Sequence, residues 1–134
     1  MNQHNRDFFD KQVEWVLARL PQSVLRILLE VPLHVEDQPS NVLREELEID
    51  NPEELCGCFS GVPYGEQSTL STAVHLPNSV TIFRRGIVAA ARDEDEWGKV
   101  RKNNLRRQIR ITILHELAHL HGMEEEEIEK LGYG

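Results

Sequence analysis

A long stretch with helical periodicity in the last third of the chain constrains the fold more than any other part. Between about Trp97 and His121, apolar residues recur at intervals of four or five positions: Val100, Leu105, Ile109, Ile113 and Leu117. This spacing predicts a helix with an apolar stripe on one face, and such a stripe packs against a sheet. Gly122 is expected to end the helix, because glycine readily adopts the left-handed conformation just past a helix C-terminus.

The sequence before this helix alternates between helical and strand-like patterns. In order, the expected elements are a helix over 7–20 closed by Pro21, a strand over 26–37, a short helix over 41–48, a long loop over 51–78 and a strand over 79–91. Pro32 indicates an edge position or a bulge for the first strand, because proline lacks the N–H that a central strand donates. A last short helix is expected over 123–132, after the turn at Gly122.

Length and composition predict a single domain over residues 1–134. A chain of 134 residues is long enough to bury a core without disulfides. Its first residues are polar and charged, and its longest apolar run, Gly86–Ala91, is far shorter than the roughly 20 residues that span a bilayer. We therefore expect a cytoplasmic protein with no membrane partner. Cys56 and Cys58 are expected to be free thiols, because one intervening residue suits a disulfide poorly.

The charge of the chain is acidic overall and unevenly distributed. The formal net charge is -8, which argues against a nucleic-acid partner, since phosphates require a basic surface. Residues 101–110, RKNNLRRQIR, are nevertheless strongly basic. At helical spacing this segment is most simply a solvated helix face, and binding of an anionic ligand is the alternative.

Two histidines near the end of the long predicted helix have the spacing of metal ligands. His115 and His119 are four residues apart, so both imidazoles project from one face and can reach the same ion. Glu116 is rotated by about 100° around the helix, which keeps it from binding the ion but within reach of a metal-bound water. Its expected role is general base, because zinc lowers the pKa of such a water to about 7.

A third ligand is expected after the turn at Gly122. Catalytic zinc usually has three protein ligands and one open position, and the two histidines supply only two. The full pattern is H-E-x-x-H-x-x-G-x-x-E, and in metallopeptidases with such a glycine the third ligand lies three residues later, here Glu125. Glu124 and Glu126 remain alternatives, although each diverges from Glu125 by about 100° on a helix. His121 is expected to lie outside the ligand set.

The sequence resembles a known family, the small bacterial "possible zincin" or minimal zincin-like metallopeptidases. The most specific match is HELAHLHG, followed by acidic residues and then LGY at 131–133. Upstream, a glycine-rich loop and the following strand are also similar, and the matching residues there are Gly57, Phe59, Gly61, Val62, Pro63, Pro77, Ile82, Phe83 and Arg84. Two features depart from the pattern: His121 stands where members have an aromatic residue, and there is no Met-turn.

The resemblance implies a zincin-like α+β fold, in which a small mixed sheet packs on a long active-site helix. It implies zinc held by His115, His119 and an acidic residue, with Glu116 as base. By analogy, an extended peptide substrate would lie along the sheet edge beside the segment SVTIFRRG, residues 79–86. The candidates for stabilising the oxyanion are Tyr133, Tyr64 and His75.

A zinc-dependent metallopeptidase acting on a peptide or protein is therefore the leading hypothesis. One alternative is a metal-stabilised binding or regulatory module, because only 12 residues follow Gly122 and cannot form the lower wall of a deep cleft. A second is a small endoribonuclease with an H-x-x-x-H-x-x-x-x-x-H site. Iron, cobalt and manganese also accept two imidazoles and a carboxylate, so only the H-E-x-x-H motif favours zinc over these metals.

Overall fold

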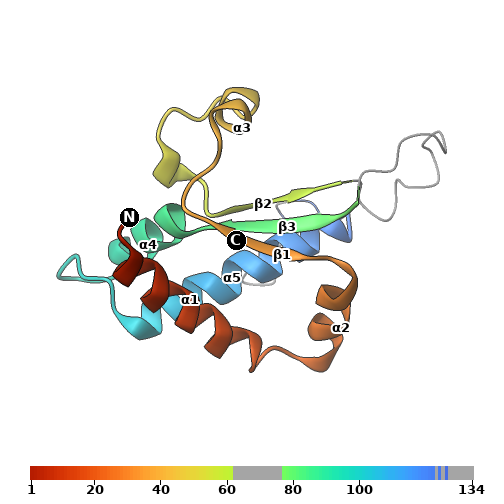
Figure 1. The fold of residues 1–134 in the computed structure, drawn as a ribbon, viewed down its shortest axis with the longest axis horizontal. Helices are drawn as coiled ribbons and strands as arrows, with labels where there is room; N and C mark the ends of the chain where they lie inside the picture. Colours follow the sequence, from red (N-terminus) through yellow and green to blue (C-terminus); the bar gives the residue numbers. More distant parts are fainter. Residues whose placement is uncertain (62–76, 123, 125, 127–134) are drawn as a thin grey trace.

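A small sheet with helices packed on one face makes up the fold (Figure 1). The computed structural model describes residues 1–61, 77–122, 124 and 126. The helices are α1 (Gln3–Leu17), α2 (Gln22–Glu30), α3 (Asn41–Glu46), α4 (Arg84–Asp93) and α5 (Lys102–Leu120), with a short 3-10 helix, η1 (Pro52–Glu54). The strands are β1 (Leu33–Glu36), β2 (Gly57–Ser60) and β3 (Ser79–Phe83). This is the α+β class predicted from the sequence.

The sheet is mixed, as expected, and β3 is its central strand in the order β1-β3-β2. β1 pairs with β3 in parallel, with Leu33 opposite Val80, and β2 pairs with β3 antiparallel, with Cys58 opposite Thr81. β1 lies at the edge of the described sheet, which was one of the two possibilities that Pro32 indicated. β2 is a correction, because its residues were assigned to a loop over 51–78. The sequence did not indicate this strand, because it is short, begins with glycine and is defined by its pairing with β3.

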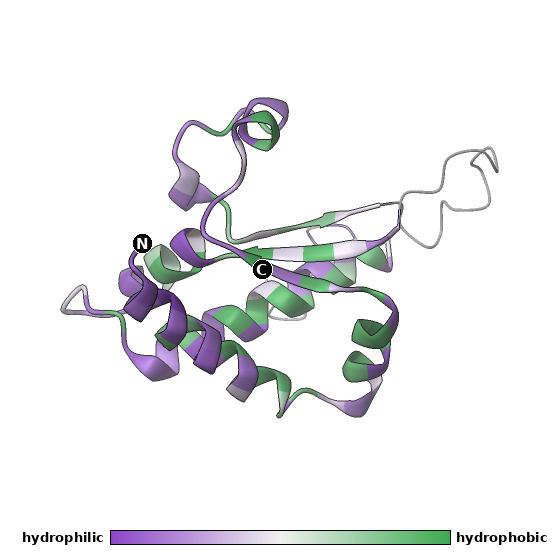
Figure 2. Ribbon diagram, in the orientation of Figure 1, coloured by the Kyte–Doolittle hydropathy of each residue, from purple (hydrophilic) through white to green (hydrophobic). Residues whose placement is uncertain are grey.

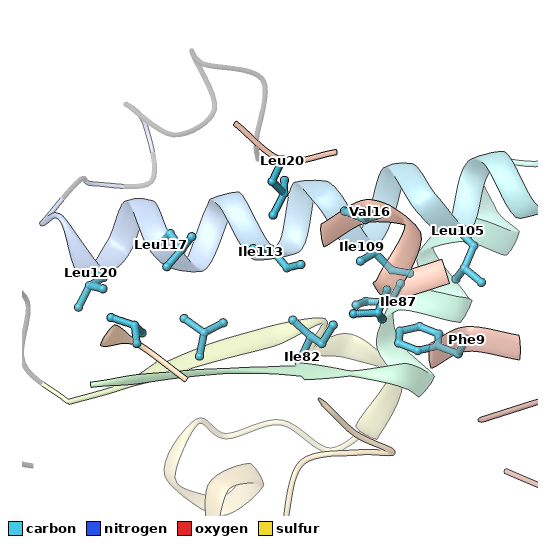
Figure 3. Packing of buried hydrophobic residues seen from close by; sticks show 14 residues of the cluster. Phe9, Val16, Leu20, Ile82, Ile87, Leu105, Ile109, Ile113, Leu117 and Leu120 are labelled. Atoms are coloured by element: carbon cyan, nitrogen blue, oxygen red, sulfur yellow. The ribbon is translucent and has the colours of Figure 1, made fainter. Parts of the chain in front are cut away.

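The core lies between the sheet and α5. Leu105, Ile109, Ile113 and Leu117 of the predicted stripe are 0–3% exposed, and Figure 3 shows them on the side of α5 that faces the sheet. In Figure 2 the same side of α5 is predominantly hydrophobic. Phe9 and Val16 from α1 and Ile87 from α4 complete the cluster around Ile82. Each such side chain contributes about 1.5–3 kcal/mol by leaving water, so α5 is firmly held.

The end of α5 is confirmed, whereas its start lies later than predicted. Gly122 has φ +79°, the left-handed conformation that stops the helix. Before α5, Asp95 accepts hydrogen bonds from the backbone N–H of Trp97 and of Lys99, and Gly98 has φ +68°. This turn holds residues 95–99 out of the helix, which therefore begins at Lys102.

Two predicted strands are partly helical in the structure. Residues 26–30 belong to α2, because the apolar residues Val24, Leu25, Ile27 and Leu28 have helical spacing and the helix starts directly after Pro21. The strand predicted over 79–91 ends at Phe83, and Arg84 begins α4. Gly86 lies in the first turn of α4 at a point where a Cβ would overlap the carbonyl oxygen of Leu55. Short apolar runs do not distinguish helix from strand by periodicity alone.

A network of ion pairs connects α1 to the ends of β1 and β3. Arg84 pairs with Asp10 and with Asp37, both at 3.0 Å, and Arg6 pairs with Asp37 at 2.6 Å. The hydrogen bonds from Arg6, together with those from Arg84, lower the pKa of the Asp37 carboxyl. The predicted helix over 123–132 lies outside the described residues. Within the described part, none of the helices is long and apolar enough to cross a membrane.

Candidate metal centre

The two histidines of the motif lie side by side on the last turns of α5. The Nε2 atoms of His115 and His119 are 3.1 Å apart, and their ring centroids are 4.7 Å apart at an interplanar angle of 71°. Both side chains are half-buried. The spacing of four residues on a regular helix brings the rings together, so the local geometry follows directly from the sequence. Both rings turn the same nitrogen toward one point, as two ligands of one ion do.

Glu116 joins the histidines in one cluster. His115, Glu116 and His119 each offer one potential ligand atom, and these three atoms lie within 4.8 Å of one another. Glu116 is only 7% exposed, which is unusual for a carboxylate. Burial of a charge is costly unless a cation or hydrogen bonds compensate it, so a buried carboxylate beside two histidines indicates a functional site.

The burial of Glu116 depends on the close approach of β2 to α5. A Cβ on Gly57 would lie 2.8 Å from Cγ2 of Thr112, 3.0 Å from the carbonyl oxygen of Thr81 and 3.3 Å from Cγ of Glu116. Glycine is therefore required for this contact. Thr112 is itself buried, and its hydroxyl donates a 2.7 Å hydrogen bond to the carbonyl oxygen of Gln108.

A cleft of about 230 Å³ opens between η1, the start of β2 and α5. Its lining includes Cys56 and Gly57 on one side and Thr112, His115 and Glu116 on the other. The lining is mostly apolar, and its ionisable groups include His115 and Glu116. A substrate group in this cleft would therefore lie next to the histidine and carboxylate cluster.

The comparison with protein families agrees with this geometry. A family model described as zincin-like metallopeptidase matches residues 28–134. The chain belongs to the zincin-like metallopeptidases. No curated protein matches it. Members of the family hold a metal, and the cluster of His115, Glu116 and His119 on α5 of this zincin-like metallopeptidase is a candidate metal-binding group.

Two cysteines lie next to the candidate metal-binding group of this zincin-like metallopeptidase, which the sequence did not indicate. Both are free thiols. Burial, together with the negative charges of Glu116 and Glu36, raises the pKa of Cys58 to about 11. Burial and Glu116 also raise the pKa of Cys56, although a hydrogen bond with Thr112 acts in the opposite direction. Both therefore remain neutral thiols at physiological pH.

Several predicted site residues are not placed by the structure. Glu125 and the oxyanion candidates Tyr64, His75 and Tyr133 lie outside the described residues. Glu124 and Glu126 are described and exposed, and His121 is exposed at the end of α5. The predicted peptide position beside residues 79–86 is wrong, because β3 is paired on both sides and its last residues continue into α4.

Proposed function

We propose that this chain is a zinc-dependent peptidase in which His115, His119 and Glu125 hold the metal and Glu116 is the general base. The observation that carries the proposal is the convergence of the two Nε2 atoms beside the buried carboxylate of Glu116, which lines a cleft. Membership in the zincin-like metallopeptidases supports the same activity.

The histidine geometry fits zinc. Zn–N distances of 2.0–2.1 Å and tetrahedral coordination place two nitrogen ligands about 3.3–3.4 Å apart. The Nε2 atoms here are 3.1 Å apart, so a small rotation of either ring reaches that value. Zinc bound there would lower the pKa of a bound water and polarise the substrate carbonyl.

Glu116 would transfer the proton that peptide hydrolysis requires. Its carboxylate would accept a proton from the attacking water and then donate that proton to the leaving amine nitrogen. Its burial keeps the side chain in one position and excludes competing solvent. Because α5 is held by its buried stripe, the carboxylate and the two imidazoles keep a constant relative position during this transfer.

The substrate would be an extended peptide segment bound along β2. β2 is an edge strand of the described sheet, and its first residue, Gly57, lines the cleft. An edge strand offers backbone N–H and C=O groups to a peptide, which adds one more strand to the sheet. This replaces the position expected beside residues 79–86. Tyr64, His75 and Tyr133 remain the candidates for oxyanion stabilisation.

A reducing location suits this site. We propose the cytoplasm, as expected from the sequence, because Cys56 and Cys58 are partly buried free thiols beside Glu116. Cytoplasmic glutathione and thioredoxin keep such thiols reduced. A peptide or protein is the proposed partner.

The test compares four glutamate-to-glutamine variants by zinc content and by cleavage of a peptide library. Glu116→Gln should retain about one zinc per chain and lose 10²–10⁴-fold in kcat. Glu125→Gln should lose both zinc and turnover. The matched controls Glu124→Gln and Glu126→Gln, which change exposed neighbours, should behave like the parent.

Three outcomes would contradict the proposal. A folded parent that takes up no zinc has no metal centre of this kind. A Glu116→Gln variant that cleaves peptides at the parental rate has another base. A parent that binds zinc and cleaves no peptide is the metal-stabilised binding module instead.

A further inference from the structure

Four arginines surround Trp15 where α1 packs against α5. Arg19 lies just after the C-terminal end of α1, and Arg106, Arg107 and Arg110 belong to α5; together we call these four side chains the arginine surface. The guanidinium carbons of Arg19 and Arg106 each lie over the Trp15 ring, 3.8 Å from its centroid. They are therefore no more than about 7.6 Å apart, which is twice 3.8 Å. The indole ring holds two like charges close together at the protein surface.

The positive charge of this surface is largely uncompensated. Arg106 donates to the neutral amide oxygen of Gln12 at 2.8 Å, and Arg19 donates to the backbone carbonyl of Trp15 at 3.0 Å. Arg107 pairs with Glu94 at 3.2 Å. Among the described residues, it is the only one of the four arginines with a carboxylate within ion-pair distance. In a chain of net charge -8, such an excess of positive charge is a local exception.

The surface is hollowed, and it is separate from the candidate metal centre. A depression of about 380 Å³ is lined by the four arginines together with Trp15, Val16 and Asn103. Arg110 precedes His115 by five residues, which turns its side chain about 140° away around the helix. Arg106, nine residues before His115, points about 180° away. A ligand here would therefore lie across α5 from the cleft.

We propose that the arginine surface binds an acidic segment of a partner protein, with several carboxylates engaging Arg19, Arg106, Arg107 and Arg110. Guanidinium groups pair with carboxylates through two parallel hydrogen bonds, and four of them around one depression suit several acidic side chains better than a single small anion. A nucleic acid is disfavoured, because two guanidinium groups already cover the Trp15 ring on which a base would stack. The negative net charge of the chain also repels a long polyanion.

The test measures fluorescence anisotropy of a labelled peptide in which glutamate alternates with glycine, beside the same peptide with glutamine. The glutamate peptide should bind at low salt (about 0.05 M), weaken as salt rises, and outcompete the glutamine peptide. Arg19→Gln/Arg110→Gln should weaken binding about tenfold or more, a loss of about 1.4 kcal/mol. The matched control, Arg26→Gln/Arg92→Gln, removes the same charge from exposed positions on α2 and α4 and should change affinity less than about twofold.

Two results would overturn the proposal: no binding of the glutamate peptide at low salt, or equal losses in the two double variants, which would show a general charge effect. If a single-stranded oligonucleotide binds more tightly than the glutamate peptide, and this binding depends on Arg19 and Arg110, the partner is a nucleic acid and not an acidic protein segment. If the double variant fails to fold, Arg110→Gln alone serves, because the exposed Arg110 side chain makes no hydrogen bond or ion pair with another described residue. None of these readouts uses peptidase activity, so the result is independent of the proposed function.

Discussion

Replacement of Gly57 by alanine tests whether the contact between β2 and α5 positions Glu116. The added methyl group would lie 2.8 Å from Cγ2 of Thr112, whereas ordinary carbon contacts are about 3.5–4.0 Å. It would also lie 3.0 Å from the backbone oxygen of Thr81 on the central strand. β3 is paired on both sides, so β2 itself must move away from α5 by about 0.7 Å or more.

The expected cost follows from two opposing effects. Overpacking of this kind costs about 1–3 kcal/mol, and the lower entropy of alanine in the unfolded chain returns about 0.4–1 kcal/mol. The net loss of about 1–2 kcal/mol in the free energy of unfolding should lower Tm by about 3–8 °C. Because Cγ of Glu116 is the third neighbour, at 3.3 Å, the carboxylate should shift and kcat/KM should fall as well.

Gly98→Ala is the matched control in thermal unfolding and peptide cleavage. Gly98 has φ +68° with no atom within 4 Å of an added Cβ, so alanine there meets backbone strain of about 1–2 kcal/mol and no steric contact. It should lower Tm while zinc content and kcat/KM stay at parental values. A Gly57→Ala variant with parental Tm and parental kcat/KM would refute the close packing of β2 on α5. A lower Tm with unchanged kcat/KM would refute the coupling to Glu116.

Two further predictions concern charge and metal. The folded-state pKa of Asp37 is lowered, so its stabilising effect is present above the unfolded pKa of about 3.9 and is lost as pH falls through the lower folded value. Asp37→Asn should therefore cost about 1–2 kcal/mol at pH 7 and little at pH 2, measured by urea unfolding, and an equal loss at both pH values would contradict this. Zinc at 100 times its Kd should stabilise the parent by about 2.7 kcal/mol over the chelated protein, and His115→Ala should abolish that difference in thermal unfolding. A zinc-dependent rise in Tm that persists in His115→Ala would exclude His115 as a ligand.

Much of the fold was predictable wherever the determining interactions are local. The stripe from Leu105 to Leu117 repeats with the period of the helix, so it identified α5 and the face that packs on the sheet. The convergence of His115 and His119 needs only helical geometry over four residues. Most of α4 and the last part of α2 were assigned to strands, because their short apolar runs fit both the helical and the strand period.

The sequence by itself therefore determined the long helix α5, the glycine that ends it and the pair of candidate metal ligands. Only the tertiary structure decided that β3 is central, that Gly57 brings β2 onto Glu116, and that Arg19 joins three arginines of α5 around Trp15. The physical reason is how far apart in the sequence the interacting residues lie. Helix formation and the i, i+4 contact depend on neighbours in the chain, whereas strand order and helix packing depend on residues brought together from distant positions.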